Sequence, residues 1–395
     1  MKKWFIILIF LGVQISAYSQ EEKPKNWTLN GYIKNLESGL FFNEAFPDLT
    51  TLQLVDTFLQ DNLLHNRLNF TWYPSSSLTL RADLRTRLFW GDLVRATPNY
   101  AQQIDEASND VLDLSVVMLD QNSFVMHSVL DRLYLEWVSD KWEVRLGRQR
   151  VNWGISAVWN PNDVFNAFSF TDFDYEERPG SDALRIKYYT GFASSIEIAA
   201  KAFENIDEAV IAGLWKFNRW NYDFQLLGGY VQGDLALGGG WAGNLKNAGF
   251  KGEFTYFLPT DNKTNRDPAF AATIGVDYSF SNSLYVNAGL LYNSEGTDKG
   301  SAGNLFNFEL SARNLYPYRT AVFLQGAYPV SPLFNSGLAI IYSPVSAQAL
   351  FVNPSLTYSI AQNWDLDLIG QIVFSKEDQY KSPVQAAFLR LKYSF

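Results

Sequence analysis

The stretch SLTLRADLRTRLFWG, residues 77–91, places apolar and charged side chains on strictly alternate positions. A period of two is typical of a β-strand whose two faces meet different surroundings. One face carries Leu78, Leu80, Ala82, Leu84, Leu88 and Trp90. The other carries Arg81, Asp83, Arg85 and Arg87. Three arginines on one face do not suit a dry protein core, because buried charges need partners or water. The strand is therefore expected to separate an apolar medium from a polar one.

The N-terminus has the pattern of a secretory signal peptide. Lys2 and Lys3 precede an apolar run at 4–13, and Ala17-Tyr18-Ser19 supplies small residues before a cleavage site. A membrane anchor needs about 20 apolar residues, and this run has ten. We therefore expect residues 1–19 to be a signal peptide and 20–395 to form a single domain.

The composition favours a membrane barrel over a secreted soluble domain. Aromatic residues make up 16% of the chain and charged residues 18%, against an ordinary charged share of about 25%. There is no cysteine, so disulfides, a lipid-anchored cysteine and a cysteine nucleophile are excluded. Aromatic girdles are typical of outer-membrane β-barrels, which lie in outer-membrane lipid. We expect no cofactor, no metal site and no nucleic-acid partner.

Alternation continues along most of the chain and predicts eighteen strands. They are 27–37, 60–73, 77–90, 126–138, 141–150, 181–190, 193–203, 208–218, 221–232, 234–243, 247–257, 269–280, 283–294, 318–329, 333–343, 348–360, 364–374 and 384–395. An even number of tilted strands near 10 residues long suits a single-chain barrel. The fold class is therefore all-β, a transmembrane antiparallel up-and-down β-barrel of about 18 strands, with 16 possible.

The connections between these strands alternate in length. Short turns follow every second strand, whereas the other set contains the long segments 38–59, 91–125, 151–180 and 295–317. Short periplasmic turns opposite long external loops are typical of outer-membrane barrels. This asymmetry predicts an outer-membrane location in a Gram-negative bacterium, with both termini in the periplasm.

The inward parity of the predicted strands carries a basic sector. It contains Arg67, Arg81, Arg85, Arg87, Arg132, Arg145, Arg185 and Lys187, with Lys34, Arg390 and Lys392 nearby once the barrel closes. Only Asp83 and Glu143 are predicted to oppose these charges. Arg148 and Arg150 fall on the lipid-facing parity, where a charge costs about 2–4 kcal/mol at the membrane midplane. We expect a bulge at Gly147 to turn both arginines into the lumen; the alternative is that they lie above the hydrocarbon.

Two long segments are acidic. Segments 91–125 and 151–180 carry eleven carboxylates against two arginines: Asp92, Asp105, Glu106, Asp110, Asp113, Asp120, Asp163, Asp172, Asp174, Glu176 and Glu177. One interpretation is that these segments fold into the barrel and set carboxylates against the basic wall. The other is that they are solvated surface loops.

Two stretches resemble known barrels. The last residues, FLRLKYSF, end in Phe395 and resemble the terminal-strand signature that the barrel-assembly machinery recognises in outer-membrane proteins. The stretches GRQRVNWG (147–154), WNPNDVFN (159–166) and EERPG (176–180) resemble a segment of porin-like barrels. Those barrels are distantly similar to eighteen-stranded alginate-export barrels with arginine-lined pores. The resemblance implies a porin-like protein without indicating its substrate.

These observations favour a channel over an enzyme. His65 and His127 are the only histidines, and neither has the spacing to a serine found in membrane hydrolases. The leading hypothesis is an outer-membrane porin-like channel that passes small polar or anionic solutes through an arginine-lined lumen. Two alternatives remain: an export conduit for an acidic polysaccharide, and a non-conducting structural barrel in a surface-assembly or secretion complex.

Overall fold

A computed structural model describes residues 25–43, 57–108, 110–168, 172–174, 177–260, 266–299, 308, 310–376 and 379–395. The expected signal peptide, residues 1–19, lies outside these ranges. Within the described chain, no helix is long and apolar enough to cross a membrane.

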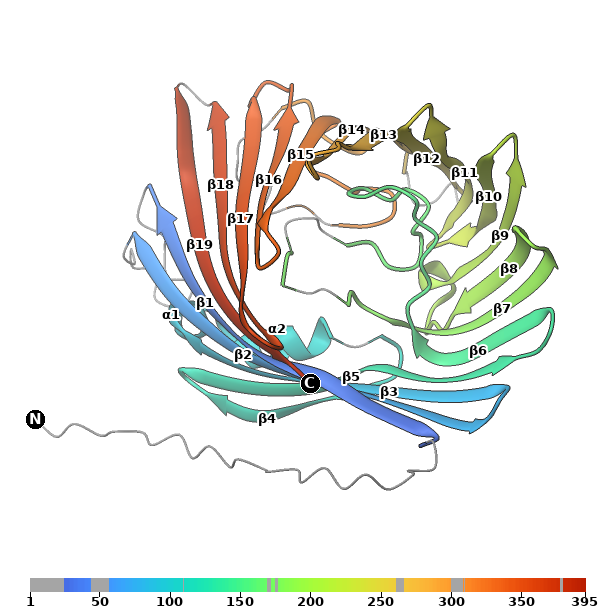
Figure 1. Ribbon diagram of the computed structural model, residues 1–395, viewed down its shortest axis with the longest axis horizontal. Helices are drawn as coiled ribbons and strands as arrows, with labels where there is room; N and C mark the ends of the chain where they lie inside the picture. The colour runs from blue at the N-terminus through green and yellow to red at the C-terminus, as the bar shows by residue number, and fades with distance from the viewer. Residues whose placement is uncertain are drawn as a thin grey trace, which may run out of the picture.

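The chain forms a closed antiparallel barrel (Figure 1). Its eighteen wall strands are β1 (Trp27–Phe42), β2 (Phe58–Ser75), β3 (Leu78–Gly91), β5 (Phe124–Val138), β6 (Trp142–Gln149), β7 (Ser181–Gly191), β8 (Ser194–Lys201), β9 (Val210–Arg219), β10 (Tyr222–Val231), β11 (Asp234–Leu245), β12 (Ala248–Pro259), β13 (Ala269–Ser279), β14 (Tyr285–Asn293), β15 (Thr320–Ser331), β16 (Phe334–Ser343), β17 (Ala349–Ala361), β18 (Trp364–Lys376) and β19 (Tyr380–Ser394). Each strand pairs with its neighbours along the chain, and β1 pairs with β19 to close the wall. The predicted fold class and the count of eighteen strands are confirmed.

Segment 91–125 is more ordered than the sequence predicts. It contains α1 (Asp92–Ala96), α2 (Tyr100–Glu106) and a nineteenth strand, β4 (Ser115–Gln121), while the short helix η1 (Ile206–Glu208) follows β8. Strand β4 pairs only with the first half of β5, and β6 pairs with the second half. Because β6 is only 8 residues long, β4 continues the wall where β6 is absent.

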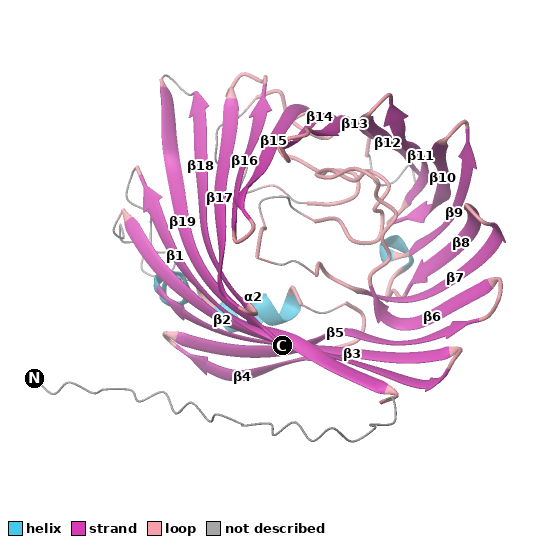
Figure 2. Cartoon of the chain, viewed as in Figure 1, coloured by secondary structure: helices cyan, strands magenta, loops and turns pink. Residues whose placement is uncertain are grey.

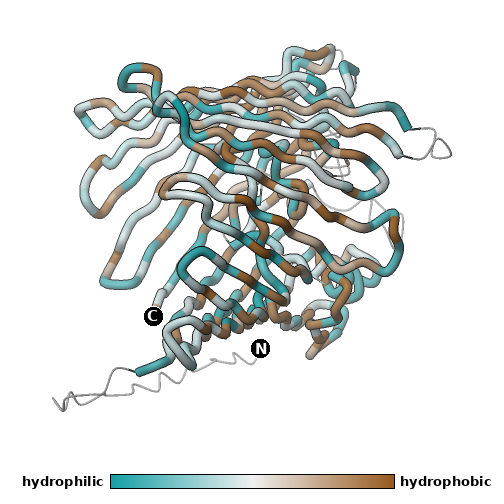
Figure 3. The backbone as a smooth tube through the Cα atoms, turned by 90° about the vertical axis from the view of Figure 1, so that its right-hand side faces the viewer, coloured by the Kyte–Doolittle hydropathy of each residue, from teal (hydrophilic) through white to brown (hydrophobic). Residues whose placement is uncertain are grey.

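The outer face of the wall is apolar around the whole barrel. On β5 and β6, for example, Leu135, Trp137 and Leu146 are more than two fifths exposed. Aromatic residues near the short turns are also exposed, among them Trp72, Tyr73, Trp137, Trp142, Trp220, Tyr278 and Phe280. Figure 3 shows apolar and polar residues alternating along the strands. So much exposed apolar surface is suited to lipid rather than to water.

A bulge in β5 explains why two consecutive residues, Asp131 and Arg132, both lie on the inner face. Leu84 pairs with Leu130 and Asp83 pairs with Arg132, so Asp131 is the extra residue. An extra residue reverses the alternation beyond it. Asp131 and Arg132 are therefore both buried, while Leu133 on the far side is exposed.

Loops occupy the interior of the ring (Figure 2). Segment 151–168, called the inner segment below, follows β6. Its Trp153, Trp159 and Phe165 are at most 7% exposed. Trp159 packs edge-on against Tyr316 from the segment before β15, and Trp153 packs against Phe165. These rings join clusters with inward side chains of the wall. The apolar core of this protein therefore lies inside the barrel, between the inner segments and one side of the wall.

Candidate functional site

The inner face is the face of the wall that contacts segment 151–168, and the arginine row of β3 lies on it. Arg81 donates to Asp83 at 2.8–3.0 Å. Arg85 is buried and lies 3.2 Å from the carboxylate of Asp131. Arg87 donates to the hydroxyl of Ser108, just beyond α2. The row is thus not an isolated set of cations: Arg81 has a partner within β3, and Arg85 and Arg87 have partners on neighbouring elements.

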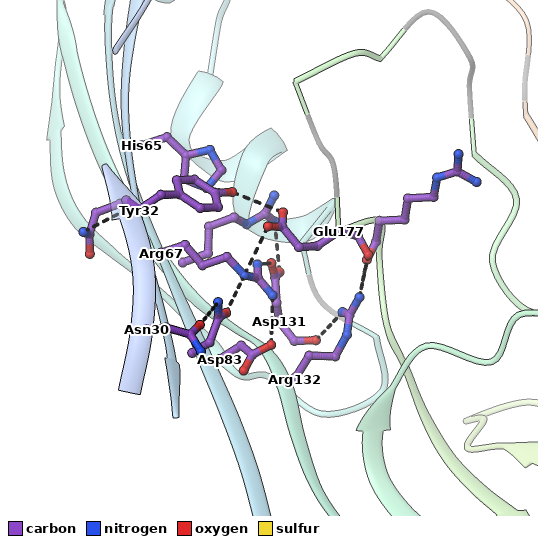
Figure 4. Close-up of polar contacts among 12 residues, drawn as sticks. Asn30, Tyr32, His65, Arg67, Asp83, Asp131, Arg132 and Glu177 are labelled. Atoms are coloured by element: carbon purple, nitrogen blue, oxygen red, sulfur yellow. Dashed lines mark hydrogen bonds and ion pairs between the residues drawn. The ribbon is translucent and has the colours of Figure 1, made fainter. Parts of the chain in front are cut away.

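Arg67 on β2 is the centre of the largest ion network (Figure 4). Its guanidinium contacts Asp131 at 2.5 Å, Asp83 at 3.1 Å and Glu177 at 3.6 Å. The side chain is only 1% exposed. The sequence predicts Asp83 as a partner, but it misses Asp131, because the bulge that brings Asp131 onto this face is not visible in the alternation.

Arg132 holds residues 177 and 178, which precede β7, against the wall. It donates to the backbone carbonyls of Glu177 and Arg178 at 2.7 and 2.6 Å (Figure 4). Tyr32 on β1 donates to the carboxylate of Glu177 at 3.1 Å. Segment 177–178 is therefore fixed to β1, β2 and β5 at once.

Asp174 likewise contacts basic residues of the wall, where β1 pairs with β19. Its carboxylate lies 2.8 Å from the ammonium of Lys34 and 3.5 Å from the guanidinium of Arg390. Burial alone would raise the pKa of Asp174, but His65 and the charge of Lys34 hold that pKa well below its usual range. Asp174 and Glu177 thus face the basic wall, as the first interpretation of the acidic segments predicts.

Segment 91–125 contributes fewer contacts of this kind. Asp105 on α2 contacts His127 of β5 at 3.0 Å, and Asp110 contacts Lys201 of β8 at 2.8 Å. Asp113 and Asp120 are exposed. Both interpretations of the acidic residues therefore hold here, each for different members of the segment.

The inner faces of β5 to β8 carry a second ladder of alternating charges. Arg145 contacts Glu136 at 3.0 Å, and Arg185 contacts Glu143. Glu197 lies 3.8 Å from Arg185. Only Glu143 among these acids is foreseen from the sequence. Carboxylates on adjacent strands therefore offset Arg145 and Arg185.

Arg148 and Arg150 are placed differently from the expectation. Pairing of β6 with β5 and β7 runs through Gly147 without a register shift, so the expected bulge is absent. Gly147 instead has a φ of +119°, and a Cβ there would lie 2.2 Å from the carbonyl oxygen of Leu133. Arg148 lies near the end of β6, paired with Leu133 and Asp182, and its buried guanidinium contacts the carboxylate of Asp182. Arg150 follows the strand and lies 3.7 Å from Asp163.

Glu253 on β12 holds the inner segment from the opposite side, and the sequence does not single it out. Its carboxylate accepts the backbone N–H groups of Ile155, Ser156 and Asn162 at 3.2, 2.9 and 3.3 Å. The GGGWAG stretch on β11 makes room beside it, since a Cβ at Gly238 would lie 2.8 Å from the side-chain oxygen of Asn162. These glycines thus permit close approach of the segment to the wall.

Asp163 is the most unusual ionisable group of the inner segment. It is 1% exposed, and the guanidinium of Arg150 lies 3.7 Å from its carboxylate. Burial raises the pKa of Asp163 to about 7, against the opposing effect of Arg150. Across the described residues, no group of three or more His, Cys, Asp and Glu is placed to hold a metal ion.

Comparisons with known proteins identify the architecture. No family model and no curated protein matches the sequence. Among solved structures, OccK9 (OpdG) of Pseudomonas aeruginosa gives a TM-score of 0.58 at 11% identity, covering 94% of this chain and 98% of that one. OccAB4 of Acinetobacter baumannii gives 0.56 at 12% identity, covering 94% and 100%. The chain has the fold of outer-membrane porins. OpdQ of P. aeruginosa gives a TM-score of 0.56 at 7% identity, covering 93% of this chain and 98% of that one. The similarity to alginate-export barrels stays a prediction.

Proposed function

We propose that this protein is an outer-membrane porin-like channel for small polar or anionic solutes. The observation that carries the proposal is the division of one closed 18-stranded wall into an apolar outer face and a charged inner face. Lipid covers the first and water fills the space beside the second in barrels of this kind. The fold shared with OccK9 and OccAB4 supports the same conclusion.

The inner segments narrow the passage rather than leave a wide pore. Segment 151–168 is held by Glu253 on one side. Asp174, Glu177 and Arg178 are held by Lys34, Arg67 and Arg132 on the other. A solute must therefore pass between charged side chains on the wall and the backbone of the segment. Such a constriction favours polar solutes, because they can form hydrogen bonds with these charged groups. An apolar molecule forms none.

The proposed solute path runs along the basic inner residues predicted from the sequence. They are Arg67, Arg81, Arg85, Arg87, Arg132, Arg145, Arg148, Arg150, Arg185 and Lys187. Most of these cations have carboxylate partners, so the proposed preference for anions is modest. The Arg81 side chain is 39% exposed, so its guanidinium is the member of such a pair that a passing carboxylate can reach.

A reconstitution experiment tests the proposal. The purified protein, inserted into a planar bilayer, is expected to open stable conductance steps and to show a reversal potential in a salt gradient that indicates anion preference. Insertion without conductance would overturn the channel. That outcome would favour the non-conducting barrel instead, for which the packing of Trp153 and Trp159 inside the wall is the supporting observation.

The proposed location is tested separately. Cell fractionation is expected to recover the protein in the outer membrane, with its migration on a gel changed by heating, as for other stable barrels. Recovery in the soluble periplasmic fraction would contradict both the location and the proposed function.

A further inference from the structure

A cavity of about 360 Å³ lies on the inner wall formed by β7 to β11. The short turn between β7 and β8, with Phe192 and Ser194, borders it at one end, and Ile155 of the inner segment borders it at the other. The cavity therefore sits between the constriction and the short-turn end of the barrel. Its volume suits a small organic molecule.

Strand register places the polar side chains of this cavity in rows. Tyr189, Ser195, Lys216, Gln225 and Gly240 are successive cross-strand partners on β7 to β11. A Cβ on Gly240 would lie 2.7 Å from Ile155, so the glycine lets the inner segment lie close above the row. Gln225 is fixed by donating to the carbonyl of Trp153 at 2.7 Å.

Two lysines of the cavity differ from the arginines of the inner wall. Over the described ranges, neither Lys187 nor Lys216 has a carboxylate at ion-pair distance. The nearest acids are engaged elsewhere: Glu143 accepts from Tyr189 at 2.9 Å and Glu197 accepts from Trp153 at 2.6 Å. The ammonium of Lys187 lies 4.7 Å from the ring centroid of Tyr189. These two ammonium groups therefore keep donors for an anionic ligand.

An acceptor lies on the same wall, one row nearer the short turns. Asp223 on β10 pairs with Asn218 on β9, whose amide donates to one carboxylate oxygen at 2.7 Å. Lys216 and Asp223 are diagonal neighbours across this strand pair, and such positions are about 7–8 Å apart. Both side chains line the cavity, so a ligand with an acceptor and a donor on adjacent carbons can contact Lys216 and Asp223 together.

We propose that this cavity binds small hydroxy and amino acids. The ligand carboxylate contacts Lys187 and Lys216, and the neighbouring hydroxyl or ammonium group donates to Asp223. The inference deepens the proposed channel function by giving it a substrate class, and it therefore rests on that function. It also relocates ligand recognition from the arginine row, whose members are held in networks, to a pair of lysines on β7 and β9.

Three ligands of one size test the proposal: propionate, lactate and alanine differ only in the substituent beside the carboxylate. Saturation-transfer NMR titrations on the detergent-solubilised full chain give their dissociation constants. Lactate and alanine are expected to bind about tenfold more tightly than propionate, which lacks the donor for Asp223. Lys216→Gln is expected to weaken all three about tenfold, and Asp223→Asn to remove most of the advantage of alanine.

Lys251→Gln is the matched control. It removes the same charge from the inner wall on β12, where Lys251 pairs with Asp277 at 2.9 Å outside the cavity. Its dissociation constants are expected to equal those of the unaltered protein. Equal binding of the three ligands, or an equal effect of K216Q and K251Q, would overturn the proposal. Since binding is measured without conduction, a non-conducting barrel that binds lactate refutes the channel alone, and a conducting one that binds nothing refutes the site alone.

Discussion

The carboxylate of Glu253 accepts the backbone N–H of Ser156 at 2.9 Å, across 97 residues of sequence. Two more N–H groups of the inner segment, from Ile155 and Asn162, bind the same carboxylate. One wall residue thus satisfies three backbone donors of a segment that has no strand or helix to satisfy them. Glu253 therefore anchors the inner segment to β12.

Glu253→Ala is expected to loosen the inner segment while leaving the barrel intact. Hydrogen bonds to a charged group contribute about 1.5–3 kcal/mol each, and the N–H groups would be left without their acceptor. Amide hydrogen exchange of residues 151–166 is expected to rise at least tenfold, with the strands unchanged. Glu208→Ala, an exposed change beside β9, is the control. Unchanged exchange in the Glu253 variant would contradict the anchoring role.

The packing of the inner segment is expected to weaken as the pH rises from about 4 to about 7. Burial raises the pKa of Asp163 to about 7, above its value near 4 in an unfolded chain. The protonated carboxyl therefore stabilises the packed segment fully below pH 4, and this contribution is lost as the pH rises towards 7. The change amounts to about 2–4 kcal/mol.

Amide exchange, corrected for its intrinsic pH dependence, measures this effect. Residues 151–166 are expected to be better protected at pH 5 than at pH 8, and Asp163→Asn is expected to reduce the difference. Asp172→Asn changes an exposed acid of the same long loop and serves as the control. Equal protection at the two pH values in the unaltered protein would refute the assignment.

Removing partly exposed arginines of β3 is expected to shift ion selectivity towards cations. The variant combines Arg81→Gln with Arg87→Gln. Asp83 then keeps Arg67 but loses Arg81, so the inner face becomes less positive. The reversal potential in a salt gradient reports the change. Arg85 is kept, because it is buried on Asp131 and its removal would disturb the wall. Arg95→Gln, an exposed change on α1, is expected to leave selectivity unaltered, and a null result in the double variant would argue against a path along β3.

Phe395 is expected to matter for assembly through two kinds of contact. Its backbone exchanges hydrogen bonds with Gly31 at 2.9 and 3.0 Å where β1 closes on β19. The C-terminal ring is also the feature that resembles the recognition signal for the barrel-assembly machinery. Deleting Phe395 is expected to lower the yield of heat-modifiable protein in the outer membrane, whereas Phe395→Tyr preserves it. Full assembly of the deletion variant would refute the expectation.

The sequence predicts the wall well and the interior poorly, for a physical reason. A strand between lipid and water repeats its pattern every two residues, so Leu78 to Trp90 indicates both the strand and its faces. Segment 151–168 has no repeat, because each of its residues meets a different partner on a distant strand. Asp131 and Glu253 could not be predicted for the same reason: a bulge re-aims the first, and only the closed barrel brings the second near Ser156.

The sequence also overstates the basic sector. Parity places Arg67, Arg145 and Arg185 on the inner face, but it does not show that Asp131, Glu136 and Glu197 lie beside them on neighbouring strands. Charge pairing across strands depends on register, and register follows from turns and bulges that alternation does not reveal. The two lysines of the cavity are therefore visible as a distinct pair only in the folded wall.

Planar-bilayer recording with a salt gradient tests the central claim most directly. The unaltered protein is expected to insert as a conducting barrel with a reversal potential that indicates anion preference. The Glu253→Ala variant is expected to have a higher conductance than the unaltered protein. Stable insertion with no current in either protein would contradict the claim that this barrel is a channel.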